Sequence, residues 1–262
     1  MTDEQPQRPV YWQIDDNGIA TVRINRARRL NALNLEVKRL LEAAITALGE
    51  NSAVRVIVLT GDNDVFVAGT DIAEMRDMTS STHADLNTGR VFEVLRTCPK
   101  PLIAAVERYA LGGGFELALA CDLIIASDEA KFAQPEIRVG IMPGAGGTQI
   151  LLRTAGRYRA LKLLLTGEQI GAAEALSCGL VSEVVPAGTT YAAALALAQT
   201  IVGMPPLAVA AIRQVVRQGQ DLPLTAALQL ERTAFTALFD SADQVEGMQA
   251  FLDKRKPDYR GC

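Results

Sequence analysis

Histidine and cysteine, from which most metal and redox sites are built, are scarce in this sequence. The 262 residues contain one histidine, His83, and four cysteines that lie far apart with no C-x-x-C pair. This pattern excludes a multi-histidine or zinc site and a disulfide framework, and it is typical of a reducing compartment. We therefore expect no metal site. A Ser-His-Asp triad would depend on His83, which lies in the polar segment 79–85, and we expect that segment to be an exposed, non-catalytic loop.

Positive charge, long apolar runs and targeting signals are also sparse. Lys and Arg number 26 against 30 Asp and Glu, which gives a net charge of −4, so we expect no nucleic-acid partner. No run approaches the ~20 apolar residues of a membrane span. Residues 1–6 are polar and acidic rather than an apolar signal core. These absences predict a cytoplasmic protein with no membrane partner.

Nucleotide-binding motifs are missing as well. The glycine-rich segments 112–117 and 144–149 both lack the third glycine of G-x-G-x-x-G, and no G-x-x-x-x-G-K-[ST] occurs. A dinucleotide or nucleoside triphosphate cofactor is therefore not expected. Apolar side chains, by contrast, are plentiful: hydrophobic residues make up 49% of the chain and charged residues 21%, enough for a large core.

The hydrophobic pattern predicts an α/β core followed by a helical region. Up to about residue 185, alternating strands and helices indicate right-handed crossovers around a largely parallel sheet, and beyond Gly188 only helical patterns remain. We expect a core at 1–190 and a helical region at 191–262. Strands are expected at 19–24, 54–60, 65–67, 102–106 and 122–126, and helices at 35–48, 87–97, 115–120, 191–202, 206–218, 225–239 and 243–253.

Two glycine-rich turns, at 68–72 and 111–117, each follow an expected strand, 65–67 and 103–106 respectively, and open a helix. Glycine lets backbone approach a ligand closely, and a helix N-terminus presents unpaired N–H groups. Two such turns from adjacent crossovers could direct two N–H donors at one oxygen, which is what an oxyanion hole requires. Ordinary tight turns in a parallel sheet are the alternative.

Two glutamates are candidates for acid–base chemistry. Glu116 has only apolar neighbours between residues 115 and 120, and Glu136 follows a Gln-Pro pair. A carboxylate among apolar groups tends to have a raised pKa and can then act as an acid or base near neutrality. The alternative for either glutamate is a salt bridge, with Arg138 or Arg153 as partner.

Taken in order, these segments resemble the enoyl-CoA hydratase/isomerase family, also called the crotonase family. The resemblance implies an α/β fold, a crotonase-like spiral of ββα units with a helical C-terminal trimerisation region, and a homotrimer or a hexamer made of two trimers. It covers nearly the whole chain and rests on residues 25–33, 66–72, 110–118, 121–124, 134–136, 140–149, 179–181 and 246–255.

The resemblance also implies a hydro-lyase that adds water to 2-enoyl-CoA in fatty acid metabolism and β-oxidation, with no cofactor, because coenzyme A is part of the substrate. The N–H groups of Thr70 and Gly113 would hold the thioester oxygen, and Glu116 and Glu136 would hold one water. The residues implied to bind coenzyme A and the acyl group are Arg28, Arg29, Leu30, Ala68, Asp71, Ile72, Pro135, Gly144, Phe251 and Lys254.

Four positions depart from the family pattern. Ala27 stands for a common proline, Thr70 for a commoner alanine and Ile150 for a frequent arginine. Glu107-Arg108 replaces the usual Asn-Gly, so either residue 108 loses its positive φ or the turn is reshaped.

Three other readings remain open from the sequence: a Δ3,Δ2-enoyl-CoA isomerase, a dehydratase acting on a polar acyl-CoA, and a non-catalytic acyl-CoA-binding protein. The segments 140–143 and 254–261 are similar to hydratases of bacterial phenylacetate degradation, which act on dicarboxylic enoyl-CoA.

Overall fold

The main sheet has six strands in the order β1-β2-β3-β4-β6-β9, and the computed structural model that contains it describes residues 8–262. β1 pairs with β2 in antiparallel fashion and all other neighbours are parallel, as the alternating pattern predicted. The expected strands at 19–24, 54–60, 102–106 and 122–126 are confirmed, whereas β1 and β9 were not predicted. The strands are β1 Val10–Ile14, β2 Ile19–Ile24, β3 Val56–Gly61, β4 Leu102–Val106, β6 Leu123–Ser127 and β9 Glu183–Val185.

A second sheet of three short strands, β5 Tyr109–Leu111, β7 Lys131–Ala133 and β8 Ile170–Gly171, lies beside the main one. It corrects two expectations. The second glycine turn follows β5, not the strand at 103–106. Residues 65–67 form no strand but contribute a single bridge, Val67 to Ala110. Strands of three residues fall below the length at which apolar alternation is readable.

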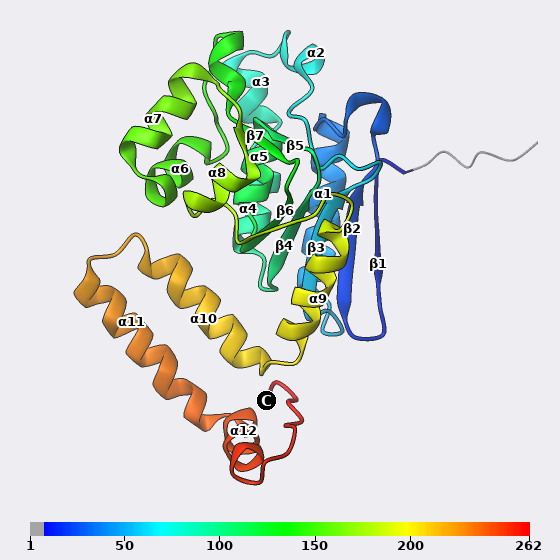
Figure 1. The fold of residues 1–262 in the computed structure, drawn as a ribbon. Helices are drawn as coiled ribbons and strands as arrows, with labels where there is room; N and C mark the ends of the chain where they lie inside the picture. Colours follow the sequence, from blue (N-terminus) through cyan, green and yellow to red (C-terminus); the bar gives the residue numbers. More distant parts are fainter. Residues whose placement is uncertain (1–7) are drawn as a thin grey trace, which may run out of the picture.

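Helices α1 Leu35–Glu50 and α4 Arg90–Thr97 cover one face of the main sheet (Figure 1). The Asn34 side chain starts α1 by accepting a hydrogen bond from the Val37 N–H at 2.9 Å, as an N-cap does. A stripe of apolar side chains on α1 is buried, which confirms the predicted helix. The stripe consists of Val37, Leu41, Ala44, Ile45 and Leu48.

The polar segment around His83 is a helix, α3 Ser80–Asp85, so the predicted loop is wrong. A capping box between Thr79 and Thr82 stabilises the start of α3 and overrides the polar composition. His83 is partly buried, with Nδ1 2.9 Å from the Thr88 hydroxyl. The short helices α2 Ile72–Met75 and α5 Gly113–Leu119 follow the two glycine turns.

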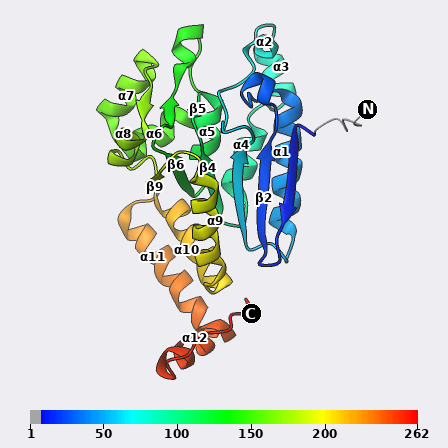
Figure 2. The ribbon, with the colours of Figure 1, turned by 45° about the vertical axis from the view of Figure 1, so that its right-hand side comes forward.

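Three further helices, η1 and η2 complete the core. The helices α6 Gly147–Ala155, α7 Arg157–Thr166 and α8 Ala172–Ser177 were not predicted. Two 3-10 turns, η1 Ala27–Arg29 and η2 Pro135–Val139, carry residues that the family resemblance implicates. The helices α6, α7 and α8 lie together at the end of the molecule away from α12 (Figures 1 and 2).

The C-terminal quarter is helical, as predicted. Helix α9 Thr190–Val202 packs on the other face of the main sheet, where Ala194 and Ala198 join a second apolar cluster. The next helices extend away from the sheet (Figure 2), and neither α10 nor α11 has a buried residue in the described chain. The helices are α10 Pro206–Gly219, α11 Leu224–Ala237 and α12 Ala242–Leu252, with η3 Leu238–Asp240 before the last. The boundary at residue 190 stays a prediction.

The described part of the chain contains no single helix that is both long and apolar enough to cross a membrane. Only α9 and α10 taken together reach that length and composition, and they are bent by 111° relative to each other. The same residues contain no cluster of three His, Cys, Asp or Glu side chains that could hold a metal ion.

Candidate active site

The first glycine turn is held in place by the segment that leads into α1. Leu33 N–H donates to Gly69 O at 2.8 Å and Asp71 N–H donates to Leu33 O at 2.9 Å, while Ala68 N–H donates to Leu30 O at 3.0 Å. In parallel pairing, a residue bonds to both neighbours of the residue opposite it. The N–H of Thr70 therefore lies outside this ladder and has no backbone acceptor among the described residues.

The second glycine turn brings the start of α5 against the first. Gly112 has a φ of 51°, which a side chain would strain, and its N–H donates to Ala133 O at 2.8 Å. Gly113 begins α5, so its N–H has no intrahelical acceptor. A Cβ on Gly113 would lie 2.5 Å from the Thr70 hydroxyl, and one on Gly114 would lie 2.2 Å from Val67 O. Only glycine permits this approach, which brings Gly113 against Thr70.

Glu116 lies one turn into α5 and is 4% exposed. Its Oε1 accepts hydrogen bonds from Ala145 N–H at 2.7 Å and Gly147 N–H at 2.9 Å, the latter at the start of α6. Backbone donors at a helix N-terminus favour the ionised carboxylate. The structure therefore fixes the position of the Glu116 carboxyl group with two backbone N–H donors.

The salt-bridge alternative for the two glutamates is wrong. Arg153 pairs with Asp221 at 3.0 Å, and Arg138 donates to the Thr166 carbonyl at 3.4 Å. Among the described ion pairs, none includes Glu116 or Glu136.

Glu136 lies in η2 and is partly buried against the second glycine turn. A Cβ on Gly112 would lie 2.7 Å from Glu136 Oε1, so this carboxyl borders the residue that precedes Gly113. Burial raises the pKa of Glu136 to about 7, its own backbone N–H opposes that shift, and the charge of Glu116 adds to it. Two neighbouring carboxyl groups with different environments are the arrangement in which one serves as base and the other as acid.

Gln134 completes the surroundings of Glu136. It is 1% exposed, and with its amide nitrogen facing the carboxyl group it donates to both oxygens of Glu136, at 3.2 and 3.1 Å. The sequence marks Gln134 only as part of the Gln-Pro-Glu segment. Its role as a donor depends on the fold of η2.

Lys38 is a site neighbour that the sequence did not reveal. It lies on α1, with Nζ 5.9 Å from the centre of the Phe92 ring. Burial lowers the pKa of Lys38, while the negative charges of Glu74 and Glu116 oppose that shift. Glu74 itself accepts a hydrogen bond from Leu35 N–H at 2.7 Å. The only signal in the sequence is that a lysine lies three residues before Leu41, at the edge of the apolar stripe.

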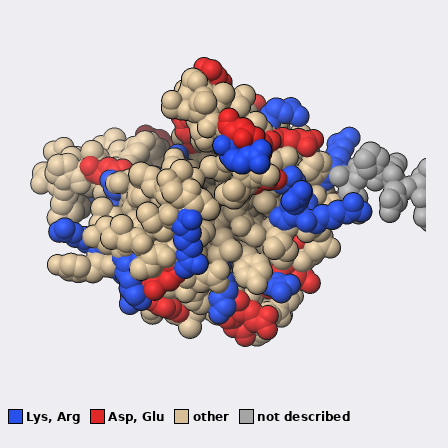
Figure 3. All heavy atoms as spheres, turned by 90° about the horizontal axis from the view of Figure 1, so that it is seen from above, with Lys and Arg blue, Asp and Glu red and all other residues tan. Residues whose placement is uncertain are grey.

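The residues predicted to contact coenzyme A through η1 lie next to the first glycine turn. Arg28, Arg29 and Leu30 are exposed on η1 and its C-terminal end. The hydrogen bond from Ala68 N–H to Leu30 O joins this element to the turn. Seen from above, basic and acidic groups surround a mostly uncharged middle (Figure 3). The role of these arginines stays a prediction.

Asp71 and Ile72 lie at the start of α2. Asp71 pairs with Arg26 at 2.8 Å, and the hydrogen bond from Arg26 lowers the pKa of Asp71 below its usual value. Asp71 also caps α2, and Ile72 is 52% exposed. Asp71 therefore has a structural role in fixing the loop, whether or not it contacts ligand.

The remaining predicted residues divide into near and far sets. Pro135 Cδ is 3.7 Å from where a Cβ on Gly112 would be, and Gly144 is exposed beside Ala145. Phe251, on α12, is 84% exposed, and Lys254 follows that helix. In one chain, α12 lies at the opposite end of the molecule from α2 and α5 (Figures 1 and 2). The structure therefore does not bring Phe251 and Lys254 to the glutamates of their own chain.

The departure at Glu107-Arg108 leaves the turn intact. Arg108 keeps a positive φ of 51° without being glycine. Glu107 finds new partners: its Oε1 accepts from Thr190 Oγ1 at 2.6 Å and from Gly188 N–H at 2.9 Å, next to the start of α9. Of the two outcomes that the sequence left open, the retained positive φ is correct.

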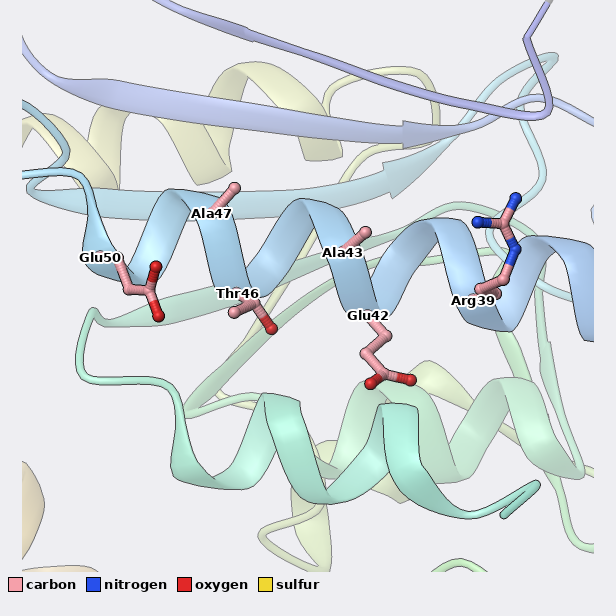
Figure 4. Close-up of a pocket in the computed structure, with 6 residues that line it drawn as sticks. All are labelled: Arg39, Glu42, Ala43, Thr46, Ala47 and Glu50. Atoms are coloured by element: carbon pink, nitrogen blue, oxygen red, sulfur yellow. The ribbon is translucent and has the colours of Figure 1, made fainter. Parts of the chain in front are cut away.

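A shallow depression on the outer face of α1 is not part of this site. Figure 4 shows Arg39 and Glu50 at its two ends, with Glu42 and the small side chains of Ala43, Thr46 and Ala47 between them. The lining residues come from one helix and do not converge on a common point, so the depression offers no chemistry. It is lined by Arg39, Glu42, Ala43, Thr46, Ala47 and Glu50.

Comparison with known proteins agrees with the geometry. A sequence model described as enoyl-CoA hydratase/isomerase matches residues 15–261. The chain is 43% identical to the 2,3-dehydroadipyl-CoA hydratase of Escherichia coli, covering 91% of this chain and 93% of that protein. It is 41% identical to the short-chain-enoyl-CoA hydratase of Clostridium acetobutylicum, covering 91% and 92%. The crystal structure of an enoyl-CoA hydratase from Bacillus anthracis superposes with a TM-score of 0.93 at 35% identity, covering 97% of this chain and 100% of that one.

Proposed function

This chain belongs to the enoyl-CoA hydratase/isomerase family, and from that membership we propose that it is a hydro-lyase adding water across the 2,3 double bond of 2-enoyl-CoA thioesters. The observation that carries the proposal is the meeting of two glycine turns beside two carboxyl groups. Thr70 and Gly113 present free N–H groups, and Glu116 and Glu136 differ in their environments.

In this proposal the N–H groups of Thr70 and Gly113 bind the thioester oxygen. Attack at C3 moves negative charge onto that oxygen, and fixed donors stabilise this charge more strongly than they stabilise the substrate. Each such donor contributes about 2.7–4 kcal/mol in comparable sites. The approach of Gly113 to Thr70 supports the assignment, because it lets both donors reach one atom.

The two glutamates divide the proton transfers. Glu116, held by hydrogen bonds from the N–H groups of Ala145 and Gly147, accepts a proton from water as the hydroxyl adds to C3. Glu136, whose pKa of about 7 keeps it partly protonated at neutral pH, gives its proton to C2. The substrate gains one water, and transfer of the proton from Glu116 to Glu136 restores both groups.

Coenzyme A is proposed to be part of the substrate, with no metal or redox cofactor. Arg28, Arg29 and Leu30 on η1, with Ala68, Asp71 and Ile72, border the oxyanion turn and are proposed to contact coenzyme A. Pro135 and Gly144 are proposed to line the acyl side. The exposed guanidinium groups of η1 suit phosphates.

Phe251 and Lys254 are proposed to complete this site in a neighbouring copy of the chain, within a homotrimer or a hexamer of two trimers. The exposed apolar side chains of the last helices support this assembly. Ile212 is 63% exposed and Leu224 is 74% exposed, which is costly unless another surface covers them. A cytoplasmic location and a role in fatty acid β-oxidation belong to the same proposal.

A dicarboxylic acyl group is the second candidate for the substrate, because the Escherichia coli relative is named for dehydroadipyl-CoA. Isomerisation of a 3-enoyl-CoA and dehydration of a polar acyl-CoA are the alternative reactions. A non-catalytic role as an acyl-CoA-binding protein is the fourth reading.

The test is an assay of the purified protein with crotonyl-CoA, a medium-chain 2-enoyl-CoA and 2,3-dehydroadipyl-CoA, following loss of the conjugated thioester. Hydration that is abolished in Glu116→Gln supports the proposal. Exchange of the C2 hydrogen with deuterium without net hydration would favour an isomerase. Binding without turnover of any of the three would refute an enzyme.

A further inference from the structure

Two arginines of α10 cover the C-terminal end of α4. Arg213 donates to Pro99 O at 2.8 Å and to Cys98 O at 3.2 Å, and Arg217 donates to Arg96 O. The last carbonyl groups of a helix have no intrahelical donor and carry partial negative charge. Arg217 supplies a donor and a positive charge to one such carbonyl, that of Arg96, and Arg213 contacts the two residues that follow α4 closely.

Asp122 holds these two arginines in position. It pairs with Arg213 at 2.8 Å and with Arg217 at 2.9 Å, and it accepts the Leu102 N–H of β4 at 2.8 Å. The Arg213 and Asp122 side chains are only 12% and 16% exposed, so water screens this pair weakly. The cluster joins α10, α4 and the main sheet.

Arg96, in the last turn of α4, extends its side chain toward the proposed catalytic base. Its Nη1 donates to Ala145 O at 2.8 Å and would lie 3.4 Å from a Cβ on Gly146. The N–H of the same Ala145 donates to Glu116 Oε1 at 2.7 Å. Both backbone groups of Ala145 are therefore in use, one on Arg96 and one on Glu116.

We propose that Arg96 is a positioning residue for hydration: it fixes the Ala145–Gly147 loop so that the loop's N–H groups hold Glu116, and α10 sets Arg96 through Arg217. The inference rests on the proposed role of Glu116 as base. It links the position of the C-terminal helices to the reactivity of a carboxyl group in the core.

The expected signature is a change in pH dependence. Without Arg96 the Ala145–Gly147 loop is less firmly fixed, so its two N–H donors hold the Glu116 carboxylate less well and activity on the acid side should fall. The charged groups that act on Glu116 are Lys38 on α1 and Glu136 on η2, and neither is changed in the Arg96 variants.

The experiment compares Arg96→Gln and Arg96→Lys with Arg90→Gln in the full-length protein, using crotonyl-CoA from pH 5 to 9. Arg90 is the matched control, since it lies on the same helix and pairs with exposed Glu93 at 3.0 Å and Glu42 at 3.7 Å. We expect Arg96→Gln to lower kcat about tenfold with KM within about twofold, because one indirect contact to a charged group is lost.

The acid limb of the Arg96→Gln profile should move to higher pH, Arg96→Lys should recover part of kcat, and Arg217→Gln should shift the limb in the same direction by less. An Arg96→Gln protein with the kcat and acid limb of Arg90→Gln would overturn the inference. So would a fall in kcat with no shift of the limb, because that is the result of a general loss of structure.

The failure of the proposed function gives a different result. If the wild-type protein does not hydrate crotonyl-CoA, or if Glu116→Gln keeps its activity, then the base is misassigned. If both of those controls hold and only Arg96→Gln behaves like Arg90→Gln, the positioning role alone is wrong.

Discussion

The sheet core and the last three helices differ in which side chains they expose to solvent. In the core, even a carboxyl group is buried with partners: Glu116 is 4% exposed and accepts two backbone N–H groups. In the last helices, large apolar side chains are left in solvent, with Phe251 at 84% and Leu252 at 73% exposed. The core buries its apolar side chains within one chain, whereas the last helices leave theirs exposed.

The largest effect should come from filling the space between the two glycine turns. In Gly113→Ala the new Cβ would lie 2.5 Å from the Thr70 hydroxyl and would push the two donors apart. We expect kcat for crotonyl-CoA to fall about 100-fold or more. Gly89→Ala is the control, since a Cβ there meets nothing within 4 Å.

The same clash predicts a rescue. Removing the hydroxyl in Gly113→Ala/Thr70→Ala should restore part of the lost kcat, although Thr70→Ala alone should change it little, because the proposed donor is backbone. If the double variant has the same kcat as Gly113→Ala, the clash with the Thr70 hydroxyl is not the cause of the loss.

Glu136→Gln should lower kcat by about 100-fold or more, because a positioned acid contributes that much to proton transfer. As an acid with a pKa of about 7, Glu136 should cause activity to fall as pH rises through that value, and the variant should lose this limb. Exposed Glu129→Gln is the control. If Glu136→Gln still loses activity as the pH rises through about 7, another group causes that fall.

Stability gives an independent check on Glu136. A carboxyl group whose folded-state pKa is raised favours the folded state at low pH, and this contribution is lost as pH rises from about 4.5 through about 7. Glu136→Gln should therefore unfold at a higher temperature than wild type at pH 8 and at a similar temperature at pH 4. Thermal unfolding at both values measures this, and the opposite order would refute the buried carboxyl.

Phe251→Ala tests whether the last helices serve another chain. We expect KM for the acyl-CoA to rise several-fold, with little change in thermal unfolding of the core, because an aromatic contact to ligand is worth about 1–3 kcal/mol. Tyr158→Ala on α7 is matched for exposure, at 86% against 84%, and should change neither. Unchanged KM in Phe251→Ala would leave the last helices without a role at the site.

Lys38→Met changes a residue of the core, and its effect on kcat should be smaller than those above. The positive charge of Lys38 attracts the negative charge of Glu116, so losing it should weaken activity at low pH and move the acid limb of the kcat profile to higher pH. Lys100→Met is the control, since Lys100 is also partly buried but interacts with Cys98 and Arg55 rather than with Glu116. A limb that moves down, or moves equally in both variants, would show that Lys38 does not act on Glu116.

Arg108→Gly should have the smallest effect. A non-glycine residue with a φ of 51° is strained, so glycine should raise the free energy of unfolding by about 1 kcal/mol or less. Arg108→Ala separates the backbone from the loss of the side chain, and it should not stabilise. Chemical denaturation of the three proteins measures both.

Much of the fold was readable because the signals are local. The spacing of apolar residues identified α1, and prolines and glycines separated the C-terminal helices. Short elements were missed: β5 and β7 have three residues each, which is too few for a period. The helix at 80–85 was missed because its composition is polar and typical of a loop. It forms because a capping box stabilises its start.

The sequence by itself determined the family, the two glycine turns and the identity of the two glutamates, since each depends on residue types within a few positions of one another. Only the tertiary structure decided that Gly113 touches Thr70 and that Glu116 is held by Ala145 and Gly147. It also decided that Lys38 lies near Glu116 and that Arg96 donates to the Ala145 carbonyl. Those contacts join segments that are far apart in the sequence. Most of the hydrogen-bonding groups belong to the backbone, which is common to all residues, so no pattern of side chains could have predicted them.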